Sequence, residues 1–234
     1  MSAAVREGTN LRALRNLMIG VLLCVGLLFG VWAIAMHRAI VEQFNYRLSV
    51  TFNENGHALT RSSVIHVTAR RAFFAILPDS ERVRYYIRGE GIPVRFSNGV
   101  LIFVLIGVAD PRPRPSFTYE AFPAYWYGRK ISALPHRTYQ VPEKFRPTMI
   151  HFGNIEDPKT VELVKPADLS RVVGEVVSLK SITVELTDAP VTWGVEKLIP
   201  WATNTSRVRD GSSPALVIRG VSEGYPYYLY RNDW

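Results

Sequence analysis

One histidine and a few carboxylates are the candidate reactive side chains of this sequence. His151 precedes Glu156 and Asp157 by only a few positions, and Glu120 lies in an aromatic-rich stretch. A carboxylate near an imidazole can serve as a general acid or base, so His151, Glu156 and Glu120 are the weak catalytic candidates. Glu156-Asp157-Pro158 is also typical of a turn. The pattern leaves both interpretations open.

Signatures of the common catalytic classes are absent from the sequence. It contains no H-E-x-x-H, no G-x-S-x-G, no G-x-x-x-x-G-K and no cysteine pair. Gly89-Glu-Gly91 lacks the third glycine of a dinucleotide loop and predicts a turn. His57 and His66 are expected on opposite arms of one hairpin, where two imidazoles could approach, but without a third ligand they do not make a zinc site. We therefore expect neither a metal nor a cofactor.

The longest apolar run extends from Asn16 to Met36 and holds no charge between Arg15 and Arg38. Twenty helical residues span roughly 30 Å, which is the thickness of the hydrocarbon core of a bilayer. The sequence therefore predicts a single transmembrane helix over residues 16–37. A short basic head, residues 1–15, precedes it, and one domain, residues 38–234, follows.

The charges beside the run indicate its orientation. Three arginines and one acid precede it and two arginines follow closely: Arg6, Glu7, Arg12, Arg15, Arg38 and Arg47. The positive-inside bias predicts a cytoplasmic N-terminus and residues 38–234 on the far side of the membrane. Ala33-Ile34-Ala35 has the pattern of a signal-peptidase site, so a soluble protein secreted after cleavage near Ala35 is the alternative.

Two features of the run bear on partners. Gly26, Gly30 and Ala33 recur near one helix face, as in membrane helices that pack closely against a second copy or a partner membrane protein. Cys24 is the only cysteine, so the domain must be stable without disulfides. The chain holds 28 Lys and Arg against 20 Asp and Glu. Outside the cytoplasm, such a basic balance favours lipid headgroups or an anionic envelope surface over nucleic acid.

The domain has the periodicity of β-strands. Apolar and polar residues alternate from Tyr46 to Phe52, and Asn53 to Gly56 supply a turn before a strand that returns to Thr68. A loop over residues 54–56 would put Ala58 and Val64 on the face of Phe52 and leave Ile65 and Val67 opposite. A second hairpin covers residues 92–109, and its apolar run 100–109 predicts a central strand buried on both faces.

A proline-rich segment, residues 110–147, interrupts this pattern and excludes long helices and central strands. It combines basic and aromatic residues and is the candidate contact surface for a partner, through the side chains of Arg112, Arg114, Tyr125, Trp126, Tyr127, Arg129 and Lys130. Such residues suit the membrane interface. The alternative is that the aromatic side chains pack onto the sheet and the charges are merely solvated.

Regular structure is expected again beyond this segment. We predict a strand at residues 149–152, a short helix at 166–174 that ends at Gly174, a half-buried strand at 182–186 and an edge strand near 225–231. The predicted fold class is mainly β, sandwich-like or a mixed antiparallel sheet, with one or two short helices, preceded by the transmembrane helix.

Several blocks together resemble a family of uncharacterised bacterial proteins that have an N-terminal transmembrane segment and a β-rich domain. The resemblance covers roughly residues 46–201, and its blocks begin at Tyr46, Ser62, Arg88, Gly99, Asp157 and Leu179. The family carries no assigned activity, so it implies no catalytic residue. It implies a bacterial origin, and hence an inner-membrane protein with a periplasmic domain.

These observations predict a single-pass, membrane-anchored protein. We expect its extracytoplasmic β domain to bind or scaffold an envelope or membrane partner rather than to catalyse a reaction. The alternative function is a hydrolase that acts on an envelope substrate with a His and carboxylate site.

Overall fold

The computed structural model describes residues 16–30, 40–71, 83–108, 116–127, 129–157, 160–174, 176–199 and 230–232. The chain divides into two compact units, residues 1–41 with 69–84, and residues 42–68 with 85–234. In the first unit, residues 16–30 form an α-helix whose large apolar side chains are exposed. No helix in the described part of the chain combines the length and the apolar character needed to cross a membrane.

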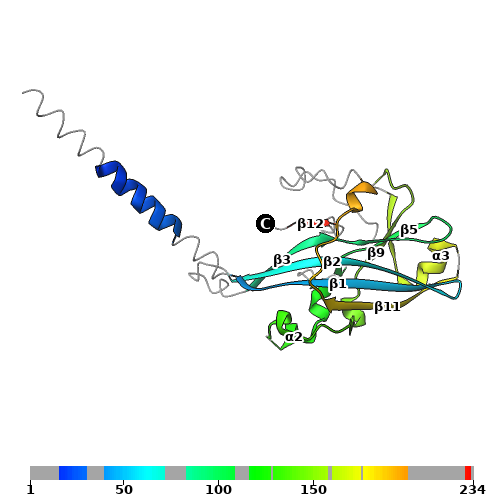
Figure 1. Ribbon diagram of the computed structural model, residues 1–234. Helices are drawn as coiled ribbons and strands as arrows, with labels where there is room; N and C mark the ends of the chain where they lie inside the picture. Colours follow the sequence, from blue (N-terminus) through cyan, green and yellow to red (C-terminus); the bar gives the residue numbers. More distant parts are fainter. Residues whose placement is uncertain are drawn as a thin grey trace, which may run out of the picture. The chain divides into compact units, whose positions relative to one another are not determined.

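The larger unit is built mainly on antiparallel β-sheets, as the sequence predicts (Figure 1). The first sheet has six strands in the order β12-β3-β2-β1-β11-β8. Their bounds are β1 Ile40–Glu54, β2 His57–Arg71, β3 Val83–Glu90, β8 Tyr139–Gln140, β11 Val177–Leu186 and β12 Tyr230–Asn232. Strand β12 confirms an edge strand near the C-terminus, although residues 225–229 of that prediction lie outside the described residues.

The second sheet has four strands in the order β10-β9-β5-β4. They are β4 Ile92–Arg95, β5 Leu101–Val104, β9 Met149–Phe152 and β10 Val161–Val164. Ile102, Phe103 and Val104 are all fully buried, which confirms a central strand covered on both faces. The strand is shorter than predicted, and Gly107–Val108 (β6) instead pairs with Ser116–Phe117 (β7).

The first hairpin turns at Asn55 and Gly56, whose φ angles are 50° and 87°. Two positive φ values match the type I′ turn, which joins strands through a two-residue loop. The expected loop over residues 54–56 was therefore wrong by one residue. The true register places Ile65 and Val67 in the core with Phe52 and leaves Ala58 exposed.

Strand β11 changes phase at an irregularity in its pairing with β1. Thr51 pairs with Ser181, but Phe52 pairs with Leu179, so Lys180 is the extra residue of a β-bulge. Beyond the bulge, Ile182 and the alternate residues toward Leu186 are buried. The apolar residues before and after the bulge alternate out of phase with each other, and the extra residue lets both sets face the core.

The segment between the two sheets' strands contains only short elements, as its prolines require. Within residues 110–147, the described elements besides the two-residue strands β7 and β8 are η2 Thr118–Ala121, α2 Pro123–Trp126, η3 Ile131–Ala133 and η4 Glu143–Phe145. Farther along, η6 Pro166–Asp168 leads into α3 Leu169–Val173, which ends at Gly174 with φ 75°. This confirms the predicted helix and its glycine stop.

Both sheets contribute to one hydrophobic core. The rings of Phe52 and Phe96 meet edge-to-face at 5.4 Å, and those of Tyr46 and Phe122 at 5.9 Å. Each fully buried aromatic or aliphatic side chain contributes roughly 1.5–3 kcal/mol. The contact of Tyr46 with Phe122, between η2 and α2, packs this part of the segment against the six-stranded sheet.

Candidate functional site

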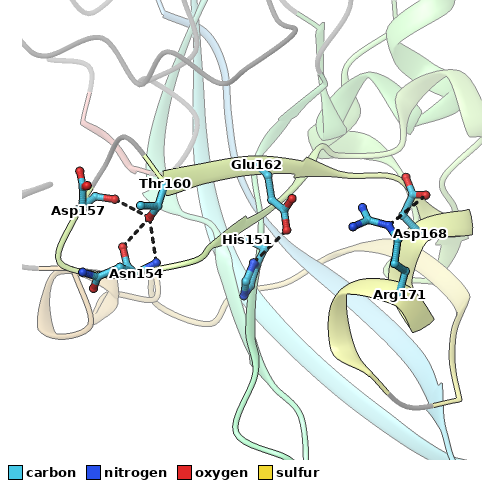
Figure 2. A network of polar contacts seen from close by, with 7 residues as sticks. All are labelled: His151, Asn154, Asp157, Thr160, Glu162, Asp168 and Arg171. Atoms are coloured by element: carbon cyan, nitrogen blue, oxygen red, sulfur yellow. Dashed lines mark hydrogen bonds and ion pairs between the residues drawn. The ribbon is translucent and has the colours of Figure 1, made fainter.

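His151 is paired with a carboxylate other than the predicted ones. It lies on β9 opposite Glu162 of β10, and its Nδ1 is 3.2 Å from Glu162 Oε1 (Figure 2). The two side chains are 20% and 45% exposed. Sequence reasoning missed Glu162 because only the strand register brings it to His151.

Glu156 and Asp157 belong to the turn that joins β9 and β10. The Asn154 N–H donates to the Thr160 hydroxyl at 2.9 Å, and that hydroxyl donates to the Asn154 and Asp157 carbonyl oxygens (Figure 2). The Glu156 N–H donates to Asn154 Oδ1 at 3.1 Å. The turn interpretation of this run therefore matches the structure.

His151 and Glu162 form the imidazole–carboxylate pair that an oriented general base requires, but they do not form a substrate site. A carboxylate that accepts a hydrogen bond from Nδ1–H would favour the imidazole tautomer in which Nε2 is the acceptor. A cavity of about 300 Å³ in the larger unit is lined instead by Asn53, Gly56, Ala58, Ser178 and Lys180. Cross-strand pairs of this kind commonly stabilise a hairpin by roughly 0.2–1 kcal/mol.

Glu120 lies in η2, away from the β9–β10 hairpin in the chain's fold, and is only 8% exposed. The rings of Tyr85, Tyr119 and Tyr125 gather beside it at centroid distances of 5.0–5.7 Å. Burial, and then the neighbouring Tyr125 and Glu120, raise the pKa of Tyr119 far above its ordinary value. This cluster holds η2 and α2 on the sheet.

The aromatic and basic residues of the segment separate into an inner and an outer set. Tyr119, Phe122 and Phe145 are buried and Tyr125 is partly buried, so most of the described aromatic side chains pack onto the sheet. The cations point to solvent: Arg129, Lys130, Arg137, Lys144 and Arg146 are all exposed. Of the predicted contact residues, Arg112, Arg114 and the side chain of Trp126 lie outside the described residues.

Three of the predicted contact residues, Tyr127, Arg129 and Lys130, directly precede a segment that is hydrogen-bonded to β1. Tyr127 is 78% exposed. Ile131, which follows Lys130, is fully buried. Ser132 donates from its backbone N–H and its hydroxyl to Glu42 Oε2 at 3.2 and 3.3 Å. These contacts join η3 to the beginning of the larger unit in β1.

A strap formed by residues 187–195 crosses the outer side of the six-stranded sheet, which the sequence did not predict (Figure 1). The Thr187 N–H donates to the Asn45 carbonyl at 3.1 Å on β1, and the Thr192 N–H to the Val64 carbonyl at 3.1 Å on β2. The strap ends where the Val195 N–H donates to Glu90 Oε2 at 3.0 Å. Glu90 is only 2% exposed.

His66 lies in a polar network that includes the strap. The Asn45 amide donates to the Ala189 carbonyl at 2.9 Å, which leaves Asn45 Oδ1 to accept from His66 Nδ1 at 2.6 Å. His66 Nε2 is then the acceptor for the Thr68 hydroxyl at 3.0 Å. Burial, and then the Arg88 charge, lower the pKa of His66.

The remaining predicted residues fall into two groups. His57 and His66 both lie on β2, nine positions apart, so the expectation of opposite hairpin arms was wrong and about 30 Å separates them. The described residues contain no group of three or more metal-ligating side chains. Gly26 and Gly30 lie on the helix of residues 16–30, where a Cβ added at either position would meet nothing within 4 Å, and Ala33 lies outside the described residues.

Comparisons with protein-family models, with curated proteins and with solved structures found no match for the chain. A function must therefore be inferred from the chemistry and position of these residues alone.

Proposed function

We propose that this chain is a single-pass, membrane-anchored protein whose extracytoplasmic β domain is a binding or scaffolding module. One observation carries the proposal: the helix of residues 16–30 presents large apolar side chains to its surroundings all along its length. Their exposed fractions run from 49% to 70%, at Leu17, Met18, Ile19, Val21, Leu22, Leu23, Val25, Leu27, Leu28 and Phe29.

These positions cover the whole circumference of the helix rather than one stripe. A helix that is apolar all round is stable when buried in lipid or in a large protein core. The apolar run of the sequence continues to Met36, which gives it the length to span roughly 30 Å. Arg15 and Arg38 at its two ends suit the headgroup regions.

The arrangement of the domain supports binding over catalysis. His151 contacts Glu162 rather than Glu156, and Glu120 is buried among tyrosines. None of these residues lines the cavity at the hairpin end of the sheet. The exposed polar and basic surface, by contrast, is extensive along residues 129–146.

The basic head and the resemblance to bacterial proteins support an inner-membrane location with a cytoplasmic N-terminus and a periplasmic domain. Gly26 and Gly30 support association with a second copy or a partner membrane protein through the helix. Release as a soluble protein by cleavage near Ala35 is the competing fate.

Membrane fractionation of the full-length protein tests the anchor. The wild-type protein should stay in the membrane pellet after alkaline carbonate extraction, at the mass of the full chain. Replacing Leu22 and Leu23 by Arg should release it, because a charge at the centre of a span costs about 2.5–3.5 kcal/mol. The matched control places the same arginines at Ala58 and Ser62, both exposed. A wild-type protein that is soluble, or shortened by about 35 residues, would refute the anchor.

A further inference from the structure

We propose that the end of the β domain formed by Tyr127, Arg129 and Lys130 binds the anionic headgroups of the bilayer in which the chain is anchored. The inference rests on the proposed function, because it requires the apolar run to lie in a membrane. It goes further by naming the partner of the domain and the residues that meet it. The proposed partner is phosphate-bearing lipid, and the test below distinguishes it from a protein partner.

The three residues are held on a firm base. Tyr127, Arg129 and Lys130 are exposed, while Ile131 directly after them is buried and Ser132 donates twice to Glu42. A surface that is fixed before binding loses less conformational entropy when it meets its partner. The cations are thus presented at a defined place on the domain.

That place is close to the anchor along the chain. Glu42 follows Met36, the end of the apolar run, by six residues. Six residues span at most about 20 Å, whatever their conformation. Asn53, at the other end of β1, is eleven residues farther along an extended strand, or roughly 36 Å from Glu42. The attachment point of η3 is therefore at the end of β1 that the chain reaches first after the apolar run.

The chemistry of the surface matches a lipid headgroup region. Arg and Lys side chains carry several N–H donors for phosphate oxygens, and an exposed tyrosine ring is typical of the interface. Between residues 116 and 142 the sequence holds one acid, Glu120, and it is buried. Each basic residue near an anionic leaflet strengthens association about fivefold.

The test uses the full-length protein in nanodiscs, with Cys24→Ser and one new cysteine for a fluorophore. Ala133→Cys reports from η3, and Ala58→Cys reports from the far end of β2; both sites are exposed. Quenching by headgroup-labelled lipid is measured with and without phosphatidylglycerol. Salt is raised from about 0.1 M to about 1 M, which shortens the screening length from roughly 10 Å to 3 Å.

We expect strong quenching at residue 133, weak quenching at residue 58, and a loss of the signal at residue 133 in high salt or in zwitterionic lipid. The double variant Arg129→Glu and Lys130→Glu should lower the equilibrium constant for docking about 25-fold or more. The matched control is Lys180→Glu with Arg95→Glu, which makes the same change in charge far from η3. Lys180 lines the cavity with Asn53, and Arg95 precedes Phe96, whose ring contacts Phe52. This control should have no effect on docking.

Two results would overturn the inference. If quenching at residue 133 is the same in anionic and zwitterionic lipid, and the same in the Arg129→Glu and Lys130→Glu variant, these cations do not bind headgroups. If the fluorophore at residue 133 is shielded from solvent only in native membranes, and never in purified lipid, the surface binds a protein partner instead. In both cases carbonate extraction still reports on the anchor, so failure of the lipid inference is distinct from failure of the proposed function. Circular dichroism of the exposed-site variants verifies their fold.

Discussion

Removal of the Glu42 carboxylate should loosen the attachment of η3 to β1. Glu42 is 8% exposed, and both of its described hydrogen bonds come from Ser132, at 3.2 and 3.3 Å. A hydrogen bond to a charged group contributes about 1.5–3 kcal/mol, and these long bonds belong at the low end. Relief of the buried charge offsets part of the loss, so Glu42→Ala should lower the free energy of unfolding by about 2 kcal/mol.

The same geometry predicts an order among related variants. Glu42→Gln keeps one oxygen for the Ser132 backbone N–H and should cost about 1 kcal/mol, while Ser132→Ala removes only an exposed hydroxyl bond and should cost about 0.5 kcal/mol. Gln43→Ala is the matched control, since its exposed amide makes only a 3.5 Å contact with Thr68. It should remain within about 0.5 kcal/mol of the wild type.

Urea and thermal unfolding of the full-length protein in mild detergent provide the assay, with hydrogen exchange of the η3 amides as the local measurement. A loss of about 2 kcal/mol corresponds to a fall in Tm of about 4–8 °C for a domain of this size. A Glu42→Ala variant indistinguishable from Gln43→Ala would show that the bonds from Ser132 to Glu42 do not stabilise the domain. A Ser132→Ala variant as unstable as Glu42→Ala would contradict the predicted order of the variants.

Three other predictions concern the strap and the sheet. Glu90→Ala should cost about 1–3 kcal/mol and speed hydrogen exchange at Val195, because it leaves a buried N–H without its acceptor; unchanged exchange would contradict this. The lowered pKa of His66 favours its neutral form in the fold, so this stability is present above the ordinary value of 6.5 and is lost as pH falls below it toward the folded pKa. His66→Gln should flatten that part of a pH–stability profile, and an unchanged slope would count against it. Gly91→Ala should destabilise by about 2–4 kcal/mol in urea titrations, because its methyl group would lie 2.7 Å from the Val104 carbonyl oxygen; Gly153, where an added Cβ would meet the Thr160 Cβ at an ordinary 3.7 Å, offers the contrasting site.

Local patterns in the sequence were enough for β1, β2, β4, β5 and β9 and for part of β11, but β3 and β10 were not predicted. Alternation from Tyr46 to Phe52 predicts β1, because the side-chain period of a strand is a local property, and Asn53 to Gly56 predict a turn whose loop, set at residues 54–56, was one residue too long. The β11 bulge also leaves a local trace, since the apolar positions shift from Val177 and Leu179 to Ile182. The residue of β1 that lies opposite the bulge, by contrast, depends on strand register and is not a local property.

Contacts between distant segments could not be predicted in the same way. Glu162 meets His151 only through the register of β9 and β10, and Glu42 meets Ser132 across 90 positions. Burial of Glu90 under the strap likewise depends on the path of a segment without regular periodicity. Such pairings are set by packing of the whole domain, which no short window of sequence encodes.

The most direct test of the account is the topology of the intact protein in spheroplasts. A single cysteine at Ala58, in the Cys24→Ser background, is treated with a membrane-impermeant thiol reagent before alkaline carbonate extraction. Residue 58 should react without lysis, and the labelled, full-length protein should remain in the membrane pellet. Labelling only after lysis, or labelled protein in the soluble fraction, would contradict a membrane-anchored protein with an extracytoplasmic β domain.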